Sequence, residues 1–208
     1  MREVGLFCGT FNPIHLGHLM MAESARDQFQ LEKVLFITSA TPPHRPSGLL
    51  DKEARHELVV AAIANNPYFE ASRLELDRDG PSYTIDTIRA VKNQHPEFTR
   101  VNLILGEDNL AYLAKWRESD EIQAMCRLLV APRDFPSPNP KYASDTPGSS
   151  QLPDASIEMM DFPLIPISAS EIRDRLRTGR SVRYMVTQEV HEILMQKRYY
   201  QDIPAGSL

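Results

Sequence analysis

Short apolar runs alternate with helix-like segments along most of this chain, and few folds accommodate that alternation. The runs are Val4–Phe7, Val34–Thr38, Val101–Leu105 and Leu128–Ala131. Each has the length of a strand and lacks alternation of polar and apolar residues, which is typical of strands buried on both faces. Because parallel strands need crossover connections, this order predicts an α/β fold: a doubly wound, Rossmann-like parallel sheet with helices on both faces.

The segments between the apolar runs show helical periodicity. In the first of them the residues that share one face are His18, Met21, Ala22, Ala25 and Phe29. Further helices are predicted at about Lys52–Asn65, from near Tyr83, and at Asp108–Lys115, Ser119–Met125, Ala169–Arg177 and Thr187–Lys197, with a short strand-like patch at Ser156–Asp161.

The length of 208 residues predicts a single domain, residues 1–208, that is long enough to bury a substantial core. Residues 132–153 differ from the rest because they contain six prolines and several serines. We interpret this stretch as a surface excursion within the domain and not as a domain boundary.

Composition excludes several classes of partner. The net charge of −5 argues against broad nucleic-acid binding, which needs a basic surface. No apolar run approaches the roughly 18–20 residues of a membrane span, and Glu3 interrupts the first run too early for a signal peptide. We therefore expect a cytoplasmic protein without nucleic-acid or membrane partners, with Cys8 and Cys126 as buried reduced thiols. The sequence leaves a homo-oligomer open.

The loop "GTFNPIHLGH", Gly9–His18, follows the first apolar run and has the features of a phosphate site. Gly9 lets the backbone approach a ligand, and Thr10–Asn12 can present N–H groups to it. The helix that follows His15 directs its positive end to the same place. His15 and His18 are three residues apart, so in a helical first turn both rings can face one way.

Other interpretations of the histidine pair remain open at this point. A histidine at a helix start is often only a cap, and two histidines could be zinc ligands in a metal hydrolase, although a zinc site needs a third ligand. The loop contains neither the G-x-G-x-x-G pattern nor G-x-x-x-x-G-K-[ST]. It is therefore a phosphate loop of another type, and we predict no metal bound by protein side chains alone.

A second candidate anion site lies in "ISASEIR", Ile167–Arg173. Ser168 and Glu171 have the spacing of a capping box, which predicts a helix start. Such a start directs free N–H groups, the Ser170 hydroxyl and the Arg173 guanidinium toward an anion. Alone, the pattern is typical of an ordinary helix start, and only its pairing with the first loop makes it specific.

Together these motifs resemble those of a known superfamily. "GTFNPIHLGH" resembles the signature G-[ST]-F-[DN]-P-x-H-x-G-H of the nucleotidyltransferases with the H-x-G-H motif, and "ISASEIR" resembles their I-S-[ST]-[ST]-x-I-R motif. "TPPHR", "PSYT" and "GEDNLAYLAKW" extend the resemblance to bacterial nicotinate mononucleotide adenylyltransferases over nearly the whole chain. Two positions depart from the pattern: Cys8 replaces a usual glycine, and Asn12 replaces the more frequent aspartate.

The resemblance implies a reaction in NAD biosynthesis. The phosphate of nicotinate mononucleotide attacks the α-phosphorus of ATP, so that nicotinate adenine dinucleotide forms and pyrophosphate leaves. No protein nucleophile is needed, and catalysis consists of alignment and charge stabilisation. The resemblance makes His15, His18 and Arg173 the catalytic residues. Mg²⁺ is implied as the cofactor, bridging phosphate oxygens with few protein ligands.

The resemblance also implies two sets of binding residues. For ATP they are Gly9, Thr10, Phe11, His15, His18, Gly106, Asp108, Ile167, Ser168, Ser170 and Arg173. For nicotinate mononucleotide they are His44, Arg45, Tyr83, Thr84, Trp116 and Arg133. Because Tyr83 and Thr84 begin a helix, this site should favour a carboxylate over a neutral amide. Asp108 could instead be a helix N-cap, and Trp116 could be a core residue.

Three other functions remain open from the sequence. The acceptor could be nicotinamide mononucleotide or phosphopantetheine, although Thr84 and Trp116 argue against the latter. The chain could be a nucleotide-binding regulator without activity, against which His15, His18 and Arg173 argue. A metal hydrolase would contain stoichiometric zinc.

Overall fold

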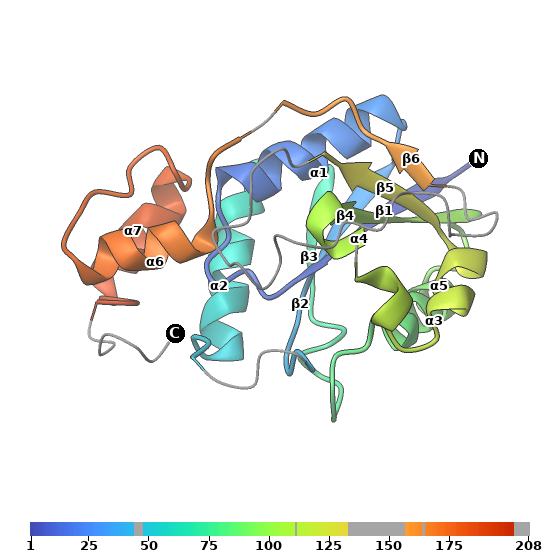
Figure 1. The fold of residues 1–208 in the computed structure, drawn as a ribbon, viewed down its shortest axis with the longest axis horizontal. Helices are drawn as coiled ribbons and strands as arrows, with labels where there is room; N and C mark the ends of the chain where they lie inside the picture. The colour runs from blue at the N-terminus through green and yellow to red at the C-terminus, as the bar shows by residue number, and fades with distance from the viewer. Residues whose placement is uncertain (44–47, 111, 133–156, 164, 202–208) are drawn as a thin grey trace.

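The computed structural model describes residues 1–43, 48–110, 112–132, 157–163 and 165–201. Six strands form one sheet in the order β3-β2-β1-β4-β5-β6, and each of the described strand pairs is parallel. The strands are β1 (Glu3–Gly9), β2 (Lys33–Thr38), β3 (Phe69–Ser72), β4 (Arg100–Gly106), β5 (Arg127–Ala131) and β6 (Ile157–Met159). Figure 1 shows this arrangement, which confirms the predicted doubly wound α/β fold.

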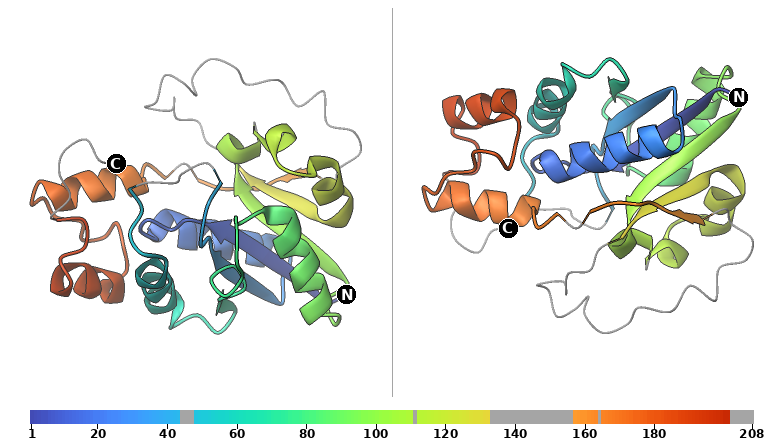
Figure 2. Two further views of the ribbon diagram at one scale, coloured as in Figure 1. Left: turned by 90° about the horizontal axis from the view of Figure 1, so that it is seen from below. Right: turned by 90° about the horizontal axis from the view of Figure 1, so that it is seen from above.

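Helices cover both faces of the sheet, as Figures 1 and 2 show. One core packs α1 and α2 against the strands, and a second core packs α3 and α5 against the opposite face. The helical elements are α1 (Leu16–Gln28), α2 (Lys52–Ile63), α3 (Thr84–Gln94), α4 (Glu107–Leu110), the 3₁₀ turn η1 (Leu113–Lys115), α5 (Ser119–Met125), α6 (Ala169–Arg177) and α7 (Gln188–Gln196). Helices α6 and α7 lie to one side of the sheet and join the first core.

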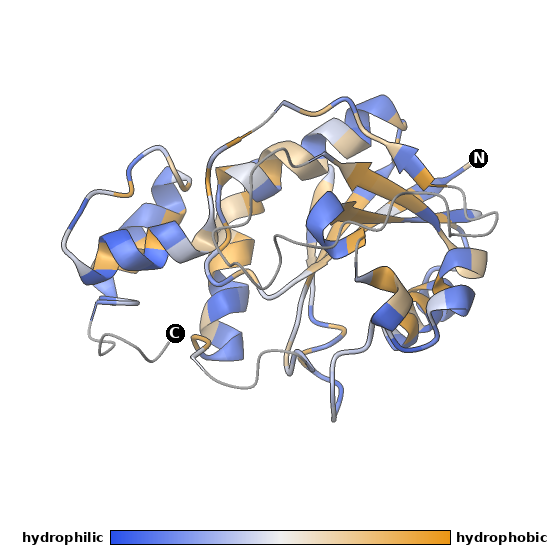
Figure 3. Ribbon diagram, in the orientation of Figure 1, coloured by the Kyte–Doolittle hydropathy of each residue, from blue (hydrophilic) through white to orange (hydrophobic). Residues whose placement is uncertain are grey.

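The central strands are apolar on both faces because both faces are covered. In β1, Val4 and Leu6 belong to the core with α3, whereas Phe7 belongs to the core with α1. Leu6 pairs in register with Leu35 of β2 and Leu103 of β4. Figure 3 shows apolar strands inside and hydrophilic helix surfaces outside, the distribution that burial of apolar area favours.

Most of the predicted elements are present within a few residues of their predicted ends. The prediction missed β3, because "FEAS" contains the exposed Glu70 and is too short to form an apolar run. The predicted helix Asp108–Lys115 is wrong in part, since α4 ends at Leu110 and only the 3₁₀ turn η1 follows. The excursion 132–153, apart from Pro132, and Ser156 of the strand-like patch lie outside the described residues.

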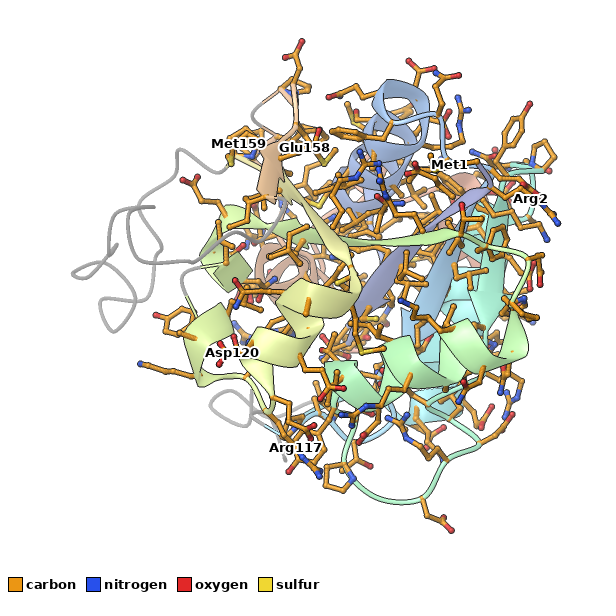
Figure 4. The ribbon with its side chains drawn as sticks, turned by 90° about the vertical axis from the view of Figure 1, so that its right-hand side faces the viewer. Met1, Arg2, Arg117, Asp120, Glu158 and Met159 are labelled. Atoms are coloured by element: carbon orange, nitrogen blue, oxygen red, sulfur yellow. The ribbon has the colours of Figure 1, made fainter. Side chains whose placement is uncertain are left out.

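A partly buried polar cluster joins four strands near their amino ends. Arg127 at the start of β5 pairs with Glu3 of β1 at 2.7 Å and donates to Asn102 of β4 at 2.6 Å. Arg127 also reaches Glu158 of β6 at 3.1 Å. Figure 4 labels Glu158 and Met159 on this edge strand. Here a mostly buried arginine has carboxylate partners, which offset the free-energy cost of its burial.

The two cysteines differ in exposure. Cys126 is buried, and burial raises the pKa of its thiol to about 12. Cys8 of β1 is partly buried against the second core, so the prediction of a buried thiol holds in part for this residue, and both cysteines are free. In the part of the chain that the structure describes, no helix combines the length and apolar character that crossing a membrane requires.

We expect the stability of the fold to decrease as the pH falls below neutral, in part because of His56. This side chain of α2 is buried, with Nδ1 3.2 Å from Thr38 Oγ1, and burial followed by the charge of Arg73 lowers its pKa below 6.5. The unfolded chain therefore binds a proton here at a higher pH than the folded chain does. The contribution of neutral His56 to the free energy of unfolding is complete above about pH 6.5 and is lost below it. The loss amounts to up to about 1.4 kcal/mol for each unit by which the pKa of the folded chain lies below that of the unfolded chain.

The prediction is tested with His56→Gln. We expect its free energy of unfolding, measured by urea denaturation, to change less between pH 7.5 and pH 5.5 than that of the unchanged protein. His191→Gln on α7, where the histidine is not fully buried, serves as the control. Identical pH dependence of all three proteins would contradict the assignment to His56.

Candidate active site

A cavity of about 690 Å³ lies at the carboxyl ends of β1 and β4. These two strands are neighbours at the point where the strand order reverses, which is where ligands bind in open α/β sheets. The walls come from the loops after β1 and β4 and from the starts of α3 and α6. The predicted site residues that line it are Gly9, Thr10, Phe11, His15, His18, Tyr83, Thr84, Gly106, Asp108, Trp116, Ile167, Ser168 and Ser170.

The loop after β1 turns at Phe11, whose φ of 44° is left-handed. The Phe11 ring packs edge-on to Phe7, with centroids 5.6 Å apart. A Cβ added at Gly9 would lie 3.0 Å from the Phe11 ring, so Gly9 makes room for this ring. This steric role of Gly9 differs from the predicted one, which was to let the backbone approach a ligand closely. Cys8 does not have a left-handed backbone, so its side chain does not strain the loop.

The two histidine rings lie face to face at the start of α1. His15 is the N-cap residue, and its ring stacks on that of His18 with centroids 3.7 Å apart and planes 27° apart. The backbone N–H of His15 donates to His18 Nδ1 at 3.2 Å. Since Nδ1 accepts this bond, the proton of a neutral His18 ring is on Nε2. The predicted common orientation of both rings is present.

The glycine between the histidines has a steric role. A Cβ at Gly17 would lie 3.1 Å from His15 Nδ1, which is tighter than ordinary contact. The His18 ring is further confined by Phe11, with ring centroids 5.3 Å apart. The H-x-G-H spacing thus packs two imidazoles together beside the positive end of a helix of 13 residues.

Asn12 joins this loop to three distant segments. Its side-chain oxygen accepts from the Leu50 backbone N–H at 3.2 Å and from the buried Tyr200 hydroxyl at 2.7 Å. Its backbone carbonyl accepts from Arg173 Nη1 at 2.8 Å. A neutral residue, Asn12, therefore lies where four parts of the chain meet, and its hydrogen bonds hold the loop in place.

The second motif begins α6 as predicted, but the capping box is only half formed. Ser168 Oγ accepts from the Glu171 backbone N–H at 3.2 Å, while the Glu171 carboxylate pairs with Arg175 at 2.9 Å. Arg173 does not line the cavity. Its guanidinium instead joins α6 to the first loop through Asn12 and donates to Ser170 Oγ at 3.2 Å.

After β4, Gly106 and Asp108 share one corner of the cavity. A Cβ at Gly106 would lie 2.5 Å from Asp108 Oδ1, so the missing side chain leaves space for the carboxylate. Asp108 lies within the short helix α4, and the alternative that it is a helix N-cap is therefore wrong. Asp108 is exposed and lines the cavity.

The other end of the cavity is lined by aromatic residues. Tyr83 is the N-cap of α3, and Thr84 is its first residue. The exposed Arg117, labelled in Figure 4, lies over the Tyr83 ring at 4.8 Å from its centroid. Trp116 is partly buried against the second core and also lines the cavity, so it packs on the core and its predicted contact with a ligand stays a prediction. His44, Arg45 and Arg133 lie outside the described residues.

Sequence reasoning missed a buried polar network at this end. Glu75 is 3% exposed and accepts from the Thr87 hydroxyl at 2.6 Å. Burial raises the pKa of Glu75, and hydrogen bonds from Thr87, Ser82 and Ser39 oppose that rise. Ser82 Oγ accepts from the backbone N–H groups of residues 40 and 41. Of the residues in this network, only Ser82 lies within a motif recognised in the sequence, "PSYT".

Comparison with known proteins identifies the class. Residues 6–175 match the model of the cytidylyltransferase-like family, and the chain belongs to this family. A solved structure from Plasmodium falciparum, a nicotinic acid mononucleotide adenylyltransferase complexed with NaAD, superposes with a TM-score of 0.76 over 96% of this chain and 98% of that one. At 16% identity this likeness shows the fold alone.

Sequence relatives narrow the class further. A protein of Dictyoglomus thermophilum named probable nicotinate-nucleotide adenylyltransferase is 38% identical over 198 residues, covering 95% of this chain and 99% of its own length. A protein of the same name from Caldicellulosiruptor bescii is 37% identical over 208 residues, covering 96% and 99%. The chain is thus a nucleotidyltransferase of the nicotinate-nucleotide adenylyltransferase family, and the resemblance is confirmed.

Proposed function

We propose that the chain transfers the adenylyl group of ATP to nicotinate mononucleotide, giving nicotinate adenine dinucleotide and pyrophosphate in NAD biosynthesis. One observation carries the proposal: a single cavity has the stacked His15 and His18 at one end and Tyr83, Thr84 and Trp116 at the other. The cavity thus offers a phosphate site and a site for a flat ring. Relatives at 37–38% identity carry the corresponding name.

The geometry of the two histidines supports a catalytic role for them. Nδ1 of His18 accepts the backbone N–H of His15, and we assign the Nε2–H to a phosphate oxygen. His15 stacks beside it at the positive end of α1. In the proposed reaction the two rings stabilise the charge that builds at the α-phosphate as the acceptor phosphate attacks in line and pyrophosphate leaves.

The start of α6 is proposed to hold the β- and γ-phosphates. Ser168 and Ser170 lie at the N-terminus of this nine-residue helix, and both line the cavity. Arg173 carries a positive charge beside Ser170. The remaining ATP contacts are proposed for Ile167, for the loop residues Gly9, Thr10 and Phe11, and for Gly106 and Asp108. The Asp108 carboxylate would accept from ribose hydroxyls.

The acceptor is proposed to bind at the start of α3. The N–H groups there, with the Thr84 hydroxyl, favour the carboxylate of nicotinate over the amide of nicotinamide. Trp116 offers its ring for stacking on the pyridine. The predicted contacts of His44, Arg45 and Arg133 with the mononucleotide phosphate stay predictions.

We also propose that Mg²⁺ accompanies ATP. Across the described ranges, no three or more histidine, cysteine, aspartate or glutamate side chains gather into a ligand set. This arrangement fits a metal held mainly by phosphate oxygens and water, which is how Mg²⁺ commonly binds with nucleotides. When bound, the metal would neutralise charge on the triphosphate. A cytoplasmic location, a single domain and a homo-oligomer likewise stay predictions.

The proposed function is tested by measuring pyrophosphate release from ATP with three acceptors in turn. We expect release with nicotinate mononucleotide and none with phosphopantetheine. Nicotinamide mononucleotide should react with a kcat/KM about 5–30-fold lower, since a helix N-terminus favours an anion by about 1–2 kcal/mol. Equal rates with acid and amide would contradict the role of α3, and no release with any acceptor would contradict the proposed function.

A further inference from the structure

Arg55 of α2 is the largest fully buried side chain among the described residues, with 1% of its surface exposed. Its guanidinium donates to three backbone carbonyls. Nη1 donates to Thr10 at 2.6 Å, Nε to Leu50 at 2.9 Å, and Nη2 to Ala40 at a longer 3.4 Å. These carbonyls belong to two loops, since Thr10 follows β1 while Ala40 and Leu50 lie near opposite ends of the connection between β2 and α2. One side chain therefore joins both loops.

The charge of Arg55 has no carboxylate partner in the described part of the chain, where no ion pair includes it. Burial lowers its pKa, and the nearby Tyr200 and Asp51 only partly oppose this effect. The adjacent Asn12 adds no negative charge, because it is an amide bonded to Leu50 N–H and the Tyr200 hydroxyl. A buried cation without a counter-charge is costly unless its surroundings or a ligand compensate it.

We propose that Arg55 is a positioning residue for the triphosphate. By holding the Thr10 carbonyl inward, it keeps that carbonyl away from the phosphates and leaves the loop N–H groups to face the cavity. Its uncompensated charge beneath the loop adds to the positive potential there. The inference rests on the proposed function because it places ATP phosphates beside Thr10, which lines the cavity.

Arg127 provides a matched control. It too is mostly buried, with its side chain 12% exposed, but it pairs with Glu3 and Glu158. It lies at the amino ends of the strands, whereas the cavity lies at their carboxyl ends. Arg127→Met therefore removes a mostly buried guanidinium without touching the cavity.

The test compares the binding of Mg·ATP, pyrophosphate and adenosine by calorimetry to Arg55→Met, Arg55→Lys and Arg127→Met. For Arg55→Met we expect ATP and pyrophosphate to bind at least about ten-fold more weakly, while adenosine binding changes less than about two-fold. Arg55→Lys should keep most of the pyrophosphate affinity, because the charge remains. Its kcat should nevertheless fall about ten-fold, because an ammonium cannot span three carbonyls. Arg127→Met should bind all three ligands normally.

Normal ATP and pyrophosphate affinity in folded Arg55→Met would overturn the proposal. If Arg55→Met does not fold, unchanged kcat in Arg55→Lys would overturn it equally. Failure of both Arg55 variants to fold, with Arg127→Met folded, would show a purely structural role and also overturn it. These binding measurements need no acceptor. The binding measurements therefore test Arg55 even if nicotinate mononucleotide is not the acceptor. Absence of ATP binding to the unchanged protein would instead refute the proposed function itself.

Discussion

Replacing His18 by alanine should lower kcat for pyrophosphate release about 10²–10³-fold, the usual effect of removing one donor that stabilises transition-state charge. The structure gives the reason. The His18 ring is fixed by the His15 N–H at 3.2 Å, by stacking on His15, and by edge contacts with Phe7 and Phe11. A donor held in this way needs no reorganisation as charge develops.

The measurement is kcat with ATP, Mg²⁺ and nicotinate mononucleotide at saturation, accompanied by the melting temperature of each variant. His191→Ala on α7 is the control, and its kcat should stay within about two-fold of the unchanged protein. We expect His18→Ala to bind ATP with little loss, since one donor among several is removed. A fall in kcat of less than ten-fold in folded protein would contradict the catalytic role of His18.

Replacing Arg173 by methionine should lower kcat/KM for ATP about 10–100-fold, mainly by raising KM. Hydrogen bonds to charged groups contribute about 1.5–3 kcal/mol each. The substitution removes both the positive charge and the hydrogen bonds that the guanidinium donates. Arg173 donates to the Asn12 carbonyl of the first loop and to Ser170 of α6. Its removal therefore separates the two motifs that are proposed to enclose the triphosphate.

The matched control for this prediction lies on the same helix. Arg175 pairs with Glu171 at 2.9 Å and is about one-third exposed, so Arg175→Met should leave kcat/KM within about two-fold. Arg173→Lys should recover part of the ATP affinity, because lysine restores the positive charge but lacks the planar, forked donors of the guanidinium. Normal kcat/KM in Arg173→Met, or an equal loss in Arg175→Met, would contradict the assignment.

The fold was predictable because its main evidence is local. Runs such as Val34–Thr38 carry their own indication of burial on both faces, and alternation with helices then restricts the topology. The strand β3 was not predictable in this way, since its four residues include the exposed Glu70 and it acquires strand geometry only by pairing with β2. Short edge strands depend on their neighbours more than on their own sequence.

The candidate site shows a similar division. The residues found from motifs, such as His15 and Ser168, lie at helix starts, where local spacing determines the geometry. Arg55 and Glu75 were not predictable, because an arginine within a helix and a glutamate in a charged segment usually face solvent. Their burial follows only from contacts with loops far away in the sequence, such as Thr10 for Arg55.

The contacts of Asn12 also bear on when the site can exist during synthesis. Asn12 is translated early, but two of its partners, Arg173 and Tyr200, lie 161 and 188 positions later. A ribosome that has released only residues through β5 has provided five of the six strands, yet the loop after β1 still lacks both contacts. Since contacts of high sequence separation form late, the nascent chain should acquire its sheet before it can hold a nucleotide.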